Sequence, residues 1–256
     1  KTQDNEVPNF GVGGDTHWAG FTVINNSSEE KLVLNLAYPT IDEVTLFVVK
    51  QGGQTDSIHM SKEQSMRARG YQHQFYLFDL NLRKGEQATC YLRMSSNKQI
   101  LVPLTLNTPT TIVSSISISD TLSGLYLGIM IVMLLYNLFI YFSARDKHYL
   151  HYVQYIFWVT ATQASLLGFL YRFFWTDNSW LVQHMLTFTG AMSGIATVVF
   201  AKSFLRSKDF APKLHKVLNL IIVGDLIAIG CLLVGFPLVA YQVVNLTAGL
   251  GSPIVV

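Results

Sequence analysis

Long stretches without charged residues are the feature of this 256-residue sequence that most limits its possible folds. Residues 121–143, 149–171 and 179–201 each contain no Asp, Glu, Lys or Arg. An α-helix needs about 20 apolar residues to cross the ~30 Å hydrocarbon core of a bilayer. Residues 217–235, interrupted only by Asp225, and residues 238–256 add two more predicted spans. The second half of the chain is therefore predicted to be a bundle of transmembrane helices, since buried helices of a soluble protein rarely run so long and so close together.

The basic residues around these stretches predict the orientation of the chain in the membrane. Short cytoplasmic loops retain Lys and Arg, whereas translocated loops lose them. Only Arg172 follows the second stretch, while the first and third are followed by clusters of basic residues: Arg145, Lys147, Lys202, Arg206, Lys208, Lys213 and Lys216. The loops after the first and third spans are therefore predicted to be cytoplasmic, and the first half of the chain to lie outside.

The first half of the sequence has the apolar pattern of β-strands. Apolar residues alternate with polar or small ones in at least six short segments, and alternation with period two places them on one face of a strand. The segments are 18–24, 32–36, 44–48, 76–82, 90–94 and 102–106. Several short strands with no helical stretch between them predict an antiparallel β-sandwich or jelly roll over residues 1–118, followed by an all-α membrane domain over 119–256.

Two places in the predicted sandwich are candidate contacts for a ligand. Residues 50–72 form a long connection between predicted strands, and Arg67, Arg69 and Tyr71 on it could stack on and hydrogen-bond a sugar ring or a carboxylated ligand. The alternative for this segment is a solvated loop without a specific role. Trp18 is the second candidate, and its alternative is a place in the core of the strand that also carries Phe21.

The predicted membrane spans contain one charged residue and two glycine pairs of interest. Asp225 is a candidate for coupling or switching, because an ionisable group in a span is costly and usually faces a partner or a water-filled cavity. Its alternative is a carboxylate that pairs with Lys216 or with a neighbouring helix, or that reaches toward the interface. Two GxxxG motifs allow close helix packing, within the bundle or in a homodimer: Gly124 with Gly128, and Gly190 with Gly194.

Other classes of function find no support in the sequence. It contains no GxSxG, HExxH or phosphate-loop motif, so we expect no catalytic residues in this chain. The histidines lack the spacing of metal ligands, and we expect neither a metal nor a cofactor. The net charge of +2 argues against nucleic-acid binding. Cys90 and Cys231 fall on opposite sides of the predicted boundary between solvents, so no disulfide is expected between them.

Several motifs, taken in order, resemble one family: the bacterial seven-transmembrane receptors with diverse intracellular signalling modules. In the second half these are Gly124–Gly128, Leu134–Tyr141, Ala144–Lys147, Tyr149–Tyr152, Phe173–Trp180 and Ala201–Leu205 with Ala211–Pro212. In the first half, His17–Trp18 with Phe21 and Asn25, and Tyr91–Met94, resemble the second type of extracellular domain of that family, a jelly roll. The resemblance extends over nearly the whole chain.

The resemblance implies a signal receptor of the bacterial inner membrane with its N-terminal domain in the periplasm. That domain is expected to bind a small ligand, with carbohydrate as one candidate, and the helices to relay the signal to a cytoplasmic diguanylate cyclase or histidine kinase. Relatives have further helices and further strands, so we expect the chain to be truncated at both ends and to lack the first strand of the sandwich. A transporter or channel, and a membrane-tethered carbohydrate-binding module, are the alternatives.

The predicted orientation can be tested by labelling engineered cysteines in cells. In a background with Cys90→Ala and Cys231→Ala, Lys208→Cys is expected to resist a membrane-impermeant thiol reagent until the inner membrane is opened. A cysteine placed in the sandwich, Thr22→Cys, is expected to react at once, because it lies on the outer side. Ready labelling at position 208 with none at position 22 would reverse the topology.

Overall fold

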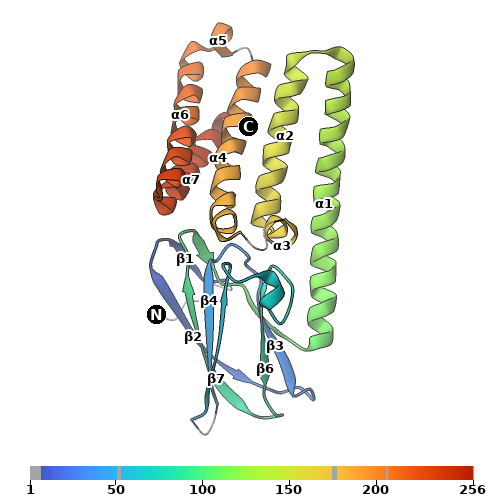
Figure 1. Ribbon diagram of the computed structural model, residues 1–256, viewed down its shortest axis with the longest axis vertical. Helices are drawn as coiled ribbons and strands as arrows, with labels where there is room; N and C mark the ends of the chain where they lie inside the picture. Colours follow the sequence, from blue (N-terminus) through green and yellow to red (C-terminus); the bar gives the residue numbers. More distant parts are fainter. Residues whose placement is uncertain (1–6, 51–52, 175–177, 206, 256) are drawn as a thin grey trace. The chain divides into compact units, whose positions relative to one another are not determined.

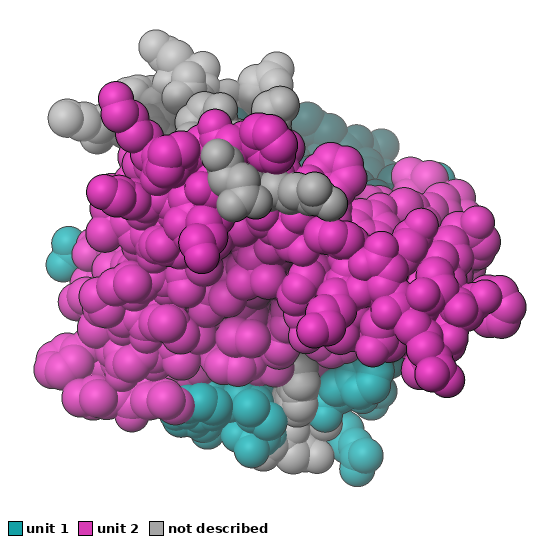
Figure 2. All heavy atoms as spheres, turned by 90° about the horizontal axis from the view of Figure 1, so that it is seen from above, with its two compact units in different colours: residues 1–121, 171–183 teal, residues 122–170, 184–256 magenta. Residues whose placement is uncertain are grey.

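The computed structural model describes residues 7–50, 53–174, 178–205 and 207–255 (Figure 1). Strands occupy the first part of the chain and helices the second, as the alternating and continuous apolar patterns predict. The chain divides into two compact units, coloured separately in Figure 2. Unit 1 comprises residues 1–121 and 171–183, and unit 2 comprises residues 122–170 and 184–256.

The described part of unit 1 contains nine β-strands arranged in three antiparallel sheets. They are β1 (Asn9–Val12), β2 (Thr16–Ile24), β3 (Lys31–Leu36), β4 (Glu43–Lys50), β5 (Thr55–Ser61), β6 (Tyr76–Asn81), β7 (Gln87–Ser95), β8 (Gln99–Leu101) and β9 (Leu104–Asn107). One sheet has the order β2-β7-β4-β5, a second β6-β3-β9, and β1 pairs with β8. A short 3-10 helix, η1 (Met66–Ala68), follows β5.

The two larger sheets enclose a common hydrophobic core. Leu34 of β3 and Phe78 of β6 contribute from one sheet, and Leu46 of β4 and Leu92 of β7 from the other, each at most 2% exposed. These residues lie at alternate positions of their strands, so each strand has one face in the core and one face outside it. This arrangement confirms the predicted antiparallel β-sandwich.

The outer face of the β6-β3-β9 sheet is covered by the first turns of the first long helix, α1 (Pro109–Ala144). Val33 of β3 and Leu77 of β6 point away from the sandwich core and pack with Ile112 of α1. All three are at most 3% exposed. The helix thus begins as part of unit 1, directly after β9, and residues 109–118, predicted from the sequence to belong to the sandwich, are helical.

The remaining helices follow in chain order. They are α2 (Lys147–Leu166), α3 (Phe169–Phe173), α4 (Ser179–Phe204), α5 (Ser207–Phe210), α6 (Pro212–Val234) and α7 (Pro237–Val255). Within the described residues α1, α4 and α6 are long and apolar enough to cross a membrane. The spans predicted at 149–171 and 238–256 correspond to α2 with α3 and to α7, and remain predictions as spans.

Local signals explain where several helices begin and end. Asp146 caps α2 by accepting a hydrogen bond from the backbone N–H of His148 at 2.9 Å. Gly235 adopts a left-handed conformation, φ 98°, after α6, and Pro237 starts α7 two residues later. Gly168, with φ 78°, separates α2 from α3 inside the stretch predicted as one continuous span.

Three details of the predicted sandwich are wrong. The connection at residues 50–72, predicted as a loop, contains β5, whose outward positions are polar and whose alternation is correspondingly weak. The strand predicted at 102–106 begins only at Leu104, as β9, because Pro103 has no backbone N–H to donate and separates β9 from β8, which ends at Leu101. Trp18 is not in the core but 56% exposed, since it lies an odd number of residues from Phe21 and so on the opposite face of β2.

Candidate functional site

The predicted ligand contacts lie in two separate places of unit 1. Trp18 belongs to the outer face of the β2-β7-β4-β5 sheet. Tyr71 packs against the cluster formed by Val33, Leu77 and Ile112, outside the other sheet. Because the sandwich core separates these two faces, the structure does not bring Trp18 together with Tyr71.

Arg69 is buried rather than available at the surface. Its side chain is enclosed between two aromatic rings, with the guanidinium carbon 4.8 Å from the ring centre of Tyr76 and 5.3 Å from that of Tyr171. Its Nη2 donates a hydrogen bond to the backbone oxygen of Ser61 at 3.0 Å. Arg67, two residues earlier, is exposed. Arg69 therefore holds the β5–β6 connection against Tyr171 of α3.

A polar cluster in unit 1 joins three segments that are distant in sequence. Asp120 of α1 accepts a hydrogen bond from Arg172 of α3 at 2.7 Å and another from Gln74 of the β5–β6 connection at 3.1 Å. Arg172 also donates to the side-chain oxygen of Gln74 at 3.1 Å. We call Asp120, Arg172, Gln74 and His73 the junction cluster. The side chains of Asp120 and Arg172 are each only about one quarter exposed. Removing the charge of either residue would therefore leave the other charge poorly solvated.

His73 completes the junction cluster as a neutral hydrogen-bond donor. Its Nδ1 accepts a hydrogen bond from the backbone N–H of Phe75 at 3.1 Å, which leaves the proton on Nε2, 3.4 Å from Asp120 Oδ1. Burial lowers the pKa of His73, and the attraction of Asp120 only partly offsets this. Because the folded-state pKa lies below the ordinary value, this contribution to stability is complete at neutral pH and is lost as the pH falls.

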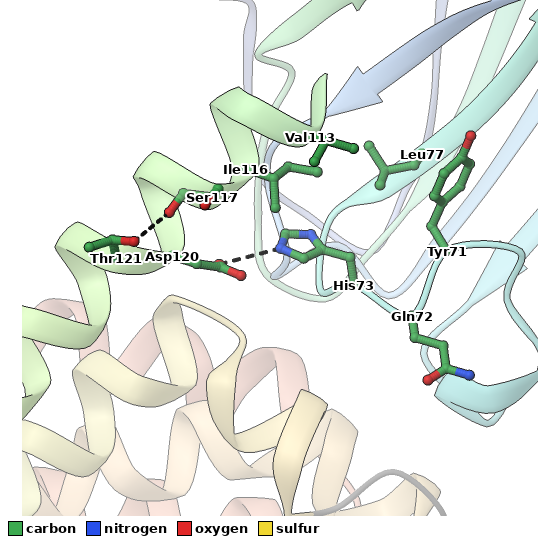
Figure 3. Close-up of a pocket in the computed structure, with 9 residues that line it drawn as sticks. All are labelled: Tyr71, Gln72, His73, Leu77, Val113, Ile116, Ser117, Asp120 and Thr121. Atoms are coloured by element: carbon green, nitrogen blue, oxygen red, sulfur yellow. Dashed lines mark hydrogen bonds and ion pairs between the residues drawn. The ribbon is translucent and has the colours of Figure 1, made fainter. Parts of the chain in front are cut away.

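A cavity of about 530 Å³ opens beside the junction cluster, between the first turns of α1 and the residues before β6 (Figure 3). Its apolar wall consists of Leu77, Val113 and Ile116, and its polar edge includes His73 and Asp120. The polar groups at this edge are engaged with one another rather than directed into open space. The cavity therefore lies where α1 and the segment before β6 come together, and Val33, Leu77 and Ile112 pack beside it.

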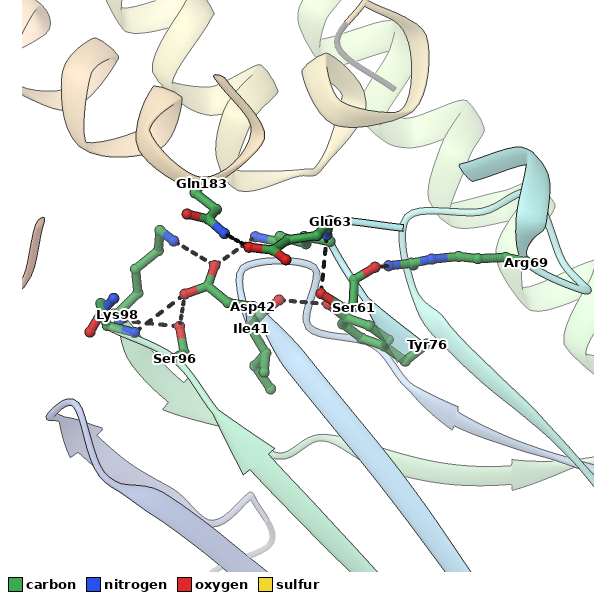
Figure 4. Close-up of polar contacts among 11 residues, drawn as sticks. Ile41, Asp42, Ser61, Glu63, Arg69, Tyr76, Ser96, Lys98 and Gln183 are labelled. Carbon is green, nitrogen blue, oxygen red and sulfur yellow. Dashed lines mark hydrogen bonds and ion pairs between the residues drawn. The ribbon is translucent and has the colours of Figure 1, made fainter. Parts of the chain in front are cut away.

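A second group of charges lies where β4 begins and β7 ends (Figure 4). Asp42 accepts hydrogen bonds from Lys98 Nζ at 2.7 Å and from the Ser96 hydroxyl at 2.8 Å, and lies 3.8 Å from Lys62 Nζ. Although burial opposes ionisation, Lys98 and Lys62 hold the pKa of Asp42 below its usual range. Glu63, next to Lys62, accepts a hydrogen bond from Gln183 of α4 at 2.5 Å.

The outer face of the β2-β7-β4-β5 sheet carries exposed aromatic rings beside polar groups. The strand register aligns Trp18, Arg93, Thr45 and His59 in one row and Gly20, Tyr91, Phe47 and Ser57 in the next. Trp18 stacks on Phe47 with ring centres 5.7 Å apart, and Trp18 and Tyr91 are 56% and 45% exposed. Thr45 and His59 share a hydrogen bond at 2.9 Å. We call these two rows the aromatic face.

Gly20 lies beside the ring of Tyr91 on the aromatic face. A side chain added at this position would meet the Tyr91 ring at 3.4 Å, so the tyrosine ring lies directly over the glycine backbone. Trp18 was identified from the sequence, but its neighbours Tyr91, Phe47 and Arg93 were missed, because strand register is not visible in a single strand.

The predicted packing residues of the helices differ in their surroundings. Gly190 of α4 faces Val244 of α7, and Gly194 faces Asp225 of α6, so this GxxxG motif supports close packing within unit 2. At Gly124 and Gly128 of α1, an added side-chain carbon would meet no described atom within 4 Å. Asp225 is buried against Thr247 of α7, not beside Lys216, which is exposed.

A β-sandwich followed by helices long and apolar enough to cross a membrane is typical of a multi-pass membrane protein, and comparison with known families agrees with that class. Residues 119–256 match the family described as 7TM diverse intracellular signalling, and residues 1–108 match the domain described as 7TMR-DISM extracellular 2. The chain belongs to this family of membrane receptors. Searches of curated proteins and of solved structures found no match.

Family membership confirms the expected resemblance, an extracellular N-terminal sensor domain and a role in transmembrane signalling. Both matched regions are sensor and membrane domains rather than catalytic ones. The junction cluster was not foreseen from the sequence. Arg172 could have indicated this cluster, because it is the one basic residue in a loop that is predicted to be translocated. Translocated loops usually lack Lys and Arg, so an arginine there suggests an ion pair or another specific contact.

The charge group around Asp42 leads to a prediction about pH dependence. Burial, with repulsion from Lys98, lowers the pKa of Lys62 from 10.5 to about 7. The unfolded chain therefore binds more protons than the folded one between these values, and the contribution of Lys62 makes stability rise with pH across that window. Lys62→Met is expected to flatten this dependence, because it removes the group whose protonation differs between the folded and unfolded chain.

Chemical unfolding of the purified protein, followed by tryptophan fluorescence at several pH values, measures this effect. Lys98→Met is the matched control, because it removes the 2.7 Å partner of Asp42 and is expected to destabilise by roughly 3–5 kcal/mol. A pH dependence in Lys62→Met as steep as in the unmodified protein would contradict the assignment.

Proposed function

We propose that this chain is the input part of a bacterial inner-membrane receptor whose sandwich binds a small carbohydrate on the aromatic face. The observation that carries the ligand class is the exposure of Trp18 and Tyr91 beside Arg93. A sugar ring has an apolar C–H face and a polar rim of hydroxyls. Exposed aromatic rings with adjacent hydrogen-bonding side chains complement both features.

The aromatic face adjoins the buried charges around Asp42. Thr45 and Arg93 lie two residues from the ends of their strands, where Glu43 of β4 pairs with Ser95 of β7. Asp42 precedes that end of β4, and Lys98 follows that end of β7. A ligand that draws β2, β7 and β4 together would therefore act on the Asp42 group, and through Lys62 and Glu63 on Gln183.

The junction cluster supports a second route from the sandwich to the helices. Asp120 belongs to α1, a single helix of 36 residues that begins at the wall of the sandwich. The ion pair with Arg172 ties this helix to the segment after α2, and Gln74 ties both to the β5–β6 connection. We propose that ligand binding shifts the equilibrium between two arrangements of these segments. The signal would pass to a cytoplasmic output domain of the diguanylate cyclase or histidine kinase type.

The ligand proposal is tested by a thermal-shift screen of the purified chain with soluble neutral oligosaccharides. A binding sugar is expected to raise the unfolding temperature. Trp18→Ala is expected to weaken its affinity about tenfold, because a stacking aromatic contributes about 1.4 kcal/mol. Thr22→Ala, exposed on the same strand, is the control. No shift with any sugar, or an undiminished shift in Trp18→Ala, would refute the carbohydrate assignment.

The relay proposal is tested by hydrogen exchange in the first turns of α1. Saturating ligand is expected to change exchange across residues 112–120, and Arg172→Gln is expected to abolish that change while leaving ligand affinity intact. Arg83→Gln makes the same chemical change at an exposed position away from the junction cluster and should leave the response unaltered. An equal response in both variants would show that the junction cluster is not part of the relay.

A further inference from the structure

The buried carboxylate of Asp225 has no counter-charge in its own region of the chain. Residues 217–256 contain no Lys, Arg or His, and Asp225 is their one charged residue. Lys216 lies nine residues away on the same helix, about 13.5 Å along its axis, and is exposed. Asp225 itself is 1% exposed. An isolated carboxylate in such surroundings is costly unless something balances its charge.

One oxygen of this carboxylate is satisfied and the other is not. Thr247 of α7 donates a hydrogen bond to Asp225 Oδ1 at 2.6 Å. Asp225 Oδ2 has no hydrogen-bond partner among the residues that the structure describes. It lies directly against the backbone of Gly194 on α4, where any side chain would collide with it. The glycine therefore makes room for the carboxylate, and the charge on Oδ2 has no hydrogen-bond donor among the described residues.

Asp225 lines a cavity of about 290 Å³ that is formed by α4, α6 and α7. Three hydroxyl-bearing residues, Ser193, Thr197 and Thr247, share the lining. Each hydroxyl already donates its hydrogen: Ser193 to the oxygen of Gly190 at 2.9 Å, Thr197 to that of Ser193 at 2.6 Å, and Thr247 to Asp225. Their remaining capacity is as acceptors, so the side chains around the cavity present oxygen lone pairs.

We propose that this cavity binds a monovalent cation, with sodium as the probe. Hard cations are held by carboxylate, hydroxyl and carbonyl oxygens, and this otherwise apolar lining supplies one carboxylate and three hydroxyls. A single carboxylate balances a single positive charge, whereas divalent sites usually gather more than one. The volume is sufficient for a small cation with several waters, since a water occupies about 30 Å³. Bound cation would hold α4, α6 and α7 together, independently of the ligand at the sandwich.

The test compares unfolding temperatures of the purified chain in sodium, potassium and choline chloride at equal ionic strength and fixed pH. Sodium is expected to raise the unfolding temperature by about 3 °C over choline. Asp225→Asn, which keeps an acceptor for Thr247, is expected to lose this difference. Asn245→Ala, at an exposed polar position of α7, should retain it. Binding of radioactive sodium to the unmodified chain provides a second measurement that needs no variant.

Each outcome distinguishes a cation bound at Asp225 from a proton there or a cation bound elsewhere. A sodium-specific rise that Asp225→Asn abolishes and Asn245→Ala preserves supports the site. Equal unfolding temperatures in all three salts, with stabilisation by acid alone, would mean that a proton balances Asp225 and would overturn the proposal. A sodium effect that survives in Asp225→Asn would place the cation elsewhere and overturn it too. If Asp225→Asn does not fold, Gly194→Ala is expected to displace Oδ2 and reduce radioactive sodium binding, and unchanged binding would overturn the proposal.

Discussion

The cost of placing charge in hydrocarbon governs the organisation of this chain. In the helical half of the chain Lys and Arg lie in the loops and near helix ends, and Asp120 of α1 and Asp225 of α6 each have a polar partner. Asp120 pairs with Arg172 at 2.7 Å, and Asp225 receives a hydrogen bond from Thr247. The same cost makes the junction cluster informative, because a partly buried ion pair is destabilising to break and therefore defines a preferred arrangement of the segments that it joins.

The sandwich and the apolar helices could be predicted from the sequence because each depends on a repeating local pattern. Alternation with period two identified β3, β4, β6 and β7, and uncharged length identified α1, α4 and α6. β5 was missed because its outward positions are polar and its apolar alternation is limited to Ile58 and Met60. The core position considered for Trp18 was wrong, because Trp18 is three residues from Phe21 on β2. Residues an odd number of positions apart on a strand face opposite sides of the sheet.

The candidate sites depend on contacts between distant segments, which no local pattern encodes. The junction cluster joins residues 46 to 98 positions apart, and the aromatic face requires the register of four strands. Arg67, Arg69 and Tyr71 were proposed as one binding edge because they are neighbours in sequence. The structure buries Arg69 between Tyr76 and Tyr171, and directs the Tyr71 hydroxyl to Asp79 at 2.6 Å. The sequence shows which side chains could bind a ligand, but it does not show whether those side chains are buried or already bonded to other residues.

The alternation along β2, β7 and β4 also has an evolutionary consequence. Residues that face the core and residues that form the aromatic face occupy interleaved positions on the same strands, as Ala19 and Phe21 alternate with Trp18 and Gly20. Substitutions on the outer face leave the packing of the inner face unchanged. Receptors built on this scaffold can therefore diversify what they recognise by point mutation, without first acquiring compensating changes in the interior.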